Sequence, residues 1–144
     1  MSLTAGIEVP PHQTAARAFA VTLRITNPTR RPIAILNPDL GVPSAEMRWR
    51  RSQDVYRAAM LISFGFLSLS VTGEAGRAVK QQAIPTWATP VLRPPVELGP
   101  RQSLAVDIPL GAFFRLRSGK TYRVAITYGD RGRQVSAQGR VSIP

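Results

Sequence analysis

The run Arg48-Trp49-Arg50-Arg51 is the densest group of chemically active side chains in this sequence. Basic residues interleaved with an aromatic ring suit phosphate contact and base stacking. In an extended strand, alternate side chains point to opposite faces, which would place Trp49 in the core beside Met47. We favour this second interpretation, in which Trp49 is a structural core residue and Arg48 and Arg50 face outward as candidate partner-binding residues.

Residues for metal binding or catalysis are scarce and scattered. The chain has no cysteine, and its single histidine, His12, follows Pro10-Pro11 in a polar linker. No Gly-x-Ser-x-Gly motif and no phosphate-binding glycine loop is present. We therefore predict a protein that is not an enzyme and that holds no metal or cofactor. A calcium site in a loop, through Asp39 or Asp130, stays open as an alternative.

The charge balance is strongly basic. Lysine and arginine number 19 against 8 acidic residues, a net charge of +11, and only Lys80 and Lys120 are lysines. Arginine-rich codon usage in a GC-rich genome explains this bias, and the scattered arginines favour that explanation for the total. An acidic partner is the functional explanation, since a positive surface attracts acidic proteins and nucleic acids.

The clearest strand signal surrounds Tyr122. A turn at Gly119 precedes alternating residues, with Tyr122, Val124, Ile126 and Tyr128 on one face and Arg123 on the other. A tyrosine directly after such a corner typically bonds to the backbone upstream. We predict that Tyr122 is buried and bonded in this way, and that Gly119 shapes the corner.

Similar alternation predicts further strands at 17–26, 104–109 and 134–143. The apolar run 58–71 alternates as well, with a phase slip between Phe66 and Leu67 that predicts a bulge or a break between two strands. A buried helix over 58–66 is the alternative. Together these patterns predict an all-β, two-sheet antiparallel sandwich. The 144 residues suit a single domain with its core in 17–144, after an N-terminal strand and linker in 1–16.

Several strand-and-turn phrases resemble a known family. Asn27 precedes a proline-rich turn, and later come Leu98-Gly99-Pro100-Arg101-Gln102-Ser103 and Gly119-Lys120-Thr121-Tyr122-Arg123-Val124. Their order resembles the immunoglobulin-like accessory domains of deuterolysin-type metallopeptidases and is similar in outline to bacterial intracellular proteinase inhibitors. The resemblance implies an immunoglobulin-like sandwich. The His-Glu-x-x-His motif of the peptidases is absent, so no catalytic residue carries over.

The arginines that alternate with core residues define the predicted functional face. Arg48, Arg50, Arg123 and Arg140 should share one sheet, while Arg24 lies on the opposite one. We predict a binding or structural module that presents this face to an acidic protein partner. The alternatives are a nucleic-acid-binding sandwich and a peptidase-linked accessory or inhibitor domain. No segment is suited to span a membrane and no signal peptide begins the sequence, so we expect a cytoplasmic location.

Overall fold

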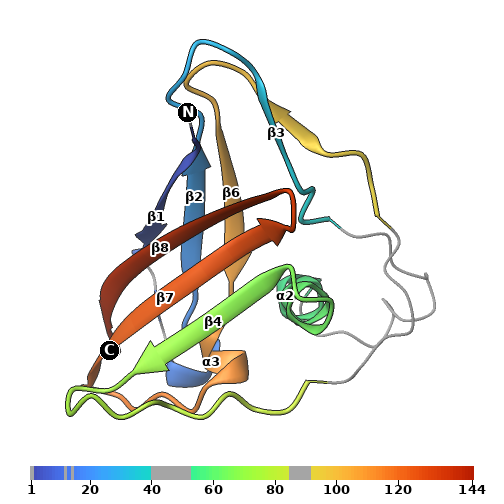
Figure 1. Ribbon diagram of the computed structural model, residues 1–144. Helices are drawn as coiled ribbons and strands as arrows, with labels where there is room; N and C mark the ends of the chain where they lie inside the picture. Colours follow the sequence, from blue (N-terminus) through green and yellow to red (C-terminus); the bar gives the residue numbers. More distant parts are fainter. Residues whose placement is uncertain (1, 12, 14, 40–52, 85–91) are drawn as a thin grey trace.

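The computed structural model describes residues 2–11, 13, 15–39, 53–84 and 92–144 (Figure 1). Its strands are β1 (Thr4–Glu8), β2 (Val21–Thr26), β3 (Ile33–Ile35), β4 (Leu67–Thr72), β5 (Val96–Leu98), β6 (Ser103–Ile108), β7 (Thr121–Asp130) and β8 (Arg133–Ser142). Its helical segments are the 3-10 turn η1 (Ala16–Ala18) and the helices α2 (Gln53–Ser63) and α3 (Leu110–Phe113). The strands form three antiparallel sheets, β1-β2-β6, β4-β7-β8 and the smaller β3-β5.

The two three-stranded sheets face each other across one hydrophobic core. In Figure 1, β4, β7 and β8 cross in front of β1, β2 and β6. The predicted alternation holds in both layers, because Val21, Leu23 and Ile25 of β2 are fully buried and so, within 1%, are Val124 and Ile126 of β7. Inward apolar and outward polar residues are what a sheet packed on one face requires. The predicted all-β sandwich is confirmed.

The two open edges of the sandwich are closed in different ways. At one edge β8 contacts β1, and a Cβ atom added to Gly139 would lie 3.6 Å from the Cβ atom of Ile7. β8 and the side chain of Ile7 on β1 are therefore in van der Waals range at this edge. At the other edge α2 packs against β4 and β6 (Figure 1), with Tyr56 and Leu61 almost completely buried.

Helix α2 corrects the prediction for the apolar run 58–71. The first part of this run is helix, as in the alternative considered above, and only the part from Leu67 is strand. Gly65, at φ +79°, ends the helix: its N–H donates to Ile62 O (3.0 Å), and the Phe66 N–H donates to Leu61 O (2.8 Å). These two bonds form a Schellman motif. The phase slip between Phe66 and Leu67 thus marks a helix-to-strand junction rather than a bulge.

The corner predicted at Tyr122 is confirmed. Tyr122 is 7% exposed, and its hydroxyl accepts a hydrogen bond of 3.0 Å from the Arg117 N–H. Gly119 lies between them at φ +79°, a conformation that glycine adopts without steric cost. The Gly119 N–H also donates to Ile143 O (2.8 Å), which ties the corner to the end of the chain.

The small β3-β5 sheet is joined to the sandwich through buried polar groups. Asn27 is completely buried, and its Nδ2 donates to Arg31 O (2.7 Å) and Leu98 O (2.9 Å). The Tyr128 hydroxyl of β7 donates to Leu36 O. Burial, together with the charge of Asp130, raises the pKa of Tyr128 above its ordinary value, so this phenol stays protonated as a donor.

Candidate binding face

The outer face of the β4-β7-β8 sheet brings two of the predicted partner-binding residues together. Arg123 of β7 lies directly opposite Arg140 of β8, and Thr72 of β4 is paired with Arg123 on its other side. Both arginines are exposed. Like charges directly opposite each other on neighbouring strands destabilise a sheet, so this pair carries a local cost in stability.

The next two rows of this face consist of uncharged and mostly short side chains. The next paired row is Ser70, Ala125 and Gln138, and the row beyond it is Ser68, Thr127 and Ser136. The hydroxyls of Thr127 and Ser136 are hydrogen-bonded to each other at 3.0 Å. Apart from Gln138 these side chains are short, so the two arginines are the longest side chains in these three rows.

Two adjoining surface hollows lie over the arginine pair. The first, of about 630 Å³, lies between Arg123, Arg140 and the turn that carries Glu74. The second, of about 370 Å³, extends along the face past Ser70 and Gln138 and is again lined by both arginines. A ligand that fills either hollow would therefore contact both arginines.

The arginine pair has no acidic counterpart in the part of the chain that the structure describes. The ion pairs found there are Arg24–Glu8, Arg57–Asp54 and Arg93–Asp39. Glu74 lines the larger hollow, but its Oε1 accepts a hydrogen bond of 3.3 Å from the Thr121 N–H. A guanidinium offers five N–H donors in a fork that matches carboxylate or phosphate oxygens, so the pair can bind an external oxyanion.

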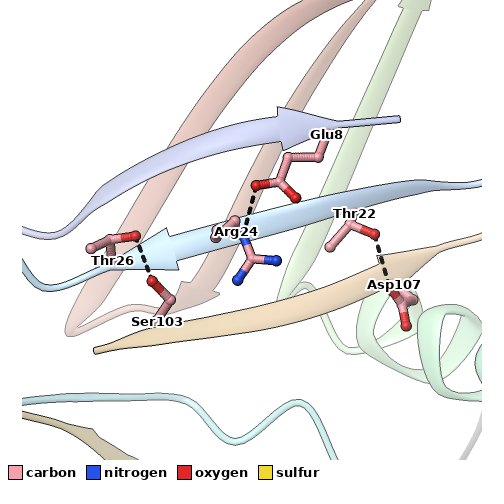
Figure 2. Close-up of polar contacts among 6 residues, drawn as sticks. All are labelled: Glu8, Thr22, Arg24, Thr26, Ser103 and Asp107. Atoms are coloured by element: carbon pink, nitrogen blue, oxygen red, sulfur yellow. Dashed lines mark hydrogen bonds and ion pairs between the residues drawn. The ribbon is translucent and has the colours of Figure 1, made fainter. Parts of the chain in front are cut away.

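Arg24 lies on the opposite sheet, as predicted, and its surroundings differ. Its Nε is 2.6 Å from Glu8 Oε1 on the neighbouring strand (Figure 2). This hydrogen bond and the charge of Glu8 raise the pKa of Arg24 above its ordinary value. Arg24 is therefore a surface residue with an internal partner, not part of the candidate face.

Three predicted residues lie outside the described residues: Arg48, Trp49 and Arg50. His12 falls there too. Sequence reasoning missed Glu74. The glycines at 73 and 76 indicate a turn, but no local pattern indicates that Glu74 in this turn bonds to the Thr121 N–H.

The candidate calcium ligands have other roles. Asp130 Oδ1 accepts hydrogen bonds from the N–H groups of Gly132 (3.0 Å) and Arg133 (3.1 Å), which closes the β7–β8 hairpin. The Oδ2 atom of Asp39 lies 4.0 Å from the Nε atom of Arg93. Within the described ranges, no three acidic or histidine side chains gather closely enough to hold a metal ion. Within the same ranges, no helix combines the length and the apolar character needed to cross a membrane.

Comparison with known proteins adds no identification. No family model matches the chain, and no curated protein matches it.

Proposed function

We propose that this chain is a non-enzymatic binding module whose β4-β7-β8 outer face contacts an acidic protein partner. The observation that carries the proposal is the exposed, directly opposed pair Arg123 and Arg140, without a carboxylate counterpart among the described residues. Such a pair costs stability in the free protein. An aspartate or glutamate from a partner, placed between the two guanidinium groups, turns this repulsion into attraction on both sides.

The character of the surrounding face favours a protein over a single-stranded nucleic acid. Binding of single strands relies on exposed aromatic rings on which bases stack. On β7 the aromatic residues Tyr122 and Tyr128 are buried, and the described outward residues of this sheet include no aromatic ring. Short serine, threonine and alanine side chains instead allow the backbone of a folded partner to approach closely.

A second copy of this chain is a poor partner for the same face. Two-fold pairing of the face would bring four guanidinium groups together in a protein of net charge +11. The peptidase-linked accessory or inhibitor role rests on the resemblance of strand-and-turn phrases alone. A co-purifying peptidase would support it.

The test is affinity capture from the native host followed by mass spectrometry, at about 0.05 M and about 0.5 M salt. The variant Arg123→Ser/Arg140→Ser is compared with Arg30→Ser/Arg31→Ser, which removes equal charge from an exposed turn. We expect an acidic protein to be captured at low salt by the wild type and the control, and lost with the face variant. Unchanged capture by the face variant, with an unchanged thermal melting temperature, would contradict the proposal.

A further inference from the structure

Two connecting segments beside the candidate face carry a high density of positive charge. They are residues 72–84, which lead out of β4, and residues 114–123, which lead from α3 into β7; Figure 1 shows both along the lower end of the molecule. Glu74 is the single acidic residue in these two segments. Their cations, all exposed, are here named the basic strip: Arg77, Lys80, Arg115, Arg117, Lys120 and Arg123.

The two segments are held side by side at both ends. Near β7, the Thr121 N–H donates to Glu74. Near α3, Gln81 forms a bridge with Phe114, and the Gln82 N–H donates to Phe113 O at 2.8 Å. The two segments that carry the basic strip therefore lie side by side, although they come from positions far apart in the sequence.

Each end of the basic strip opens into a surface hollow. One end is the Arg123–Arg140 hollow described above. At the other end, hollows of about 330 and 590 Å³ share Gln82 and Arg115 as lining residues. Arg17 of η1 lines the first of these and Lys80 the second, and no acidic residue is among their described lining. This second site, Arg17, Lys80 and Arg115, is here named the far-end cluster.

Among the described residues, no carboxylate forms an ion pair with a cation of the strip. All three ion pairs within the described residues use arginines outside it, namely Arg24, Arg57 and Arg93. Elsewhere on the described surface, some arginines are paired with carboxylates, whereas the cations of the strip are not. A field of this kind attracts a polyanion along its length and not at one point.

We propose that the basic strip binds an extended, acidic segment of the partner polypeptide, which runs from the Arg123–Arg140 hollow to the far-end cluster. This inference rests on the proposed function and names the form of the partner. The seven residue steps from Phe114 to Thr121 span at most roughly 25 Å, which an extended peptide of about seven residues also covers. Phe113, Phe114 and Tyr122 are buried, so the described strip offers no ring for base stacking, which favours an acidic peptide over single-stranded nucleic acid.

Fluorescence anisotropy with the full chain tests this proposal. The probes are a labelled oligoglutamate of about ten residues and, as separate arms, single-stranded and duplex DNA of similar charge. The far-end variant is Arg17→Ser/Lys80→Ser/Arg115→Ser. The matched control, Arg30→Ser/Arg31→Ser/Arg131→Ser, also removes three exposed cations, but from turns outside the strip.

We expect the far-end variant to weaken oligoglutamate binding about tenfold, since three exposed charge contacts are lost, and the control to weaken it less than about twofold. Equal weakening in both would mean that net charge alone binds the peptide and would overturn the proposal. So would tighter binding of either DNA than of oligoglutamate. A further outcome is that the far-end variant still captures the host partner while the Arg123→Ser/Arg140→Ser variant does not. That result would support binding at the β4-β7-β8 face and contradict binding along the basic strip. The reverse pattern refutes the face.

Discussion

The outer faces of the two three-stranded sheets present arginines in opposite surroundings. On the β1-β2-β6 face, Arg24 is paired with Gly6 and Ala105, and these small neighbours leave it free to reach diagonally to Glu8. The face is completed by hydrogen bonds from Thr22 to Asp107 and between Thr26 and Ser103, both 2.9 Å (Figure 2). On the β4-β7-β8 face, the cross-strand neighbour of Arg123 is a second arginine.

The difference lies in cross-strand neighbours, not in the number of arginines. All three arginines alternate with core residues on their strands, and all three are exposed. A diagonal carboxylate satisfies one of them within the fold, whereas the other two repel each other. The residue directly across the strands therefore distinguishes the arginine pair from Arg24, whereas outward orientation alone does not.

The largest expected effect tests the hydrophobic core that lies beneath both faces. Leu23 lies beneath the first face and Ile126 beneath the second, and they are 0% and 1% exposed. Leu23→Ala and Ile126→Ala should each cost about 2–5 kcal/mol of stability through the cavity they leave. Urea denaturation followed by two probes should give one transition for each variant. Two separate transitions would show that the faces belong to independently folding layers.

Next in size is the corner that supports the second face alone. Tyr122→Phe should cost about 1 kcal/mol in urea denaturation, since the Arg117 N–H loses its acceptor. The control is Arg117→Ala, which keeps the N–H group and should leave the stability nearly unchanged. An equal loss in both variants would argue that the arginine side chain, not the hydrogen bond, holds the corner.

A smaller effect is expected when an arginine of the second face is given a carboxylate neighbour, as Arg24 has on the first face. Arg140→Glu places a carboxylate opposite Arg123 and should stabilise the fold by roughly 0.2–1 kcal/mol, while capture of an acidic partner is lost. The gain should shrink at high salt, and Arg140→Gln should retain part of it by removing the repulsion alone. A destabilised Arg140→Glu protein would mean that the two side chains do not interact across the strands.

The smallest expected effect is the reverse exchange on the first face. Glu8→Gln removes the carboxylate partner of Arg24, but its two cross-strand neighbours, Gly6 and Ala105, are uncharged and cannot share an oxyanion with it. Oligoglutamate binding should therefore rise by less than about twofold. A larger rise would show that a single unpaired arginine is enough to make a binding face.

The sequence predicted those features that depend on local patterns. The alternation in β7 and β8 predicted that Arg123 and Arg140 point outward, and the strand pairing expected of an immunoglobulin-like sandwich placed them on one sheet. The spacing from Gly119 to Tyr122 predicted the corner. The direct opposition of the arginines depends on the register of the β7–β8 hairpin, which alternation alone does not set. The strand prediction for the start of the 58–71 run is wrong because short apolar segments fit helix and strand alike; Gly65 is the local signal for the helix end.

The corner at Tyr122 also bears on the kinetics of association. The hydrogen bond from the Arg117 N–H and the link from Gly119 to Ile143 hold the backbone between Arg117 and β7 in one conformation before any partner arrives. Little backbone entropy then has to be lost in the encounter. If the proposed function holds, we expect a charged, preformed surface of this kind to give association rates that fall steeply with ionic strength, with dissociation set by the few contacts at the arginine pair.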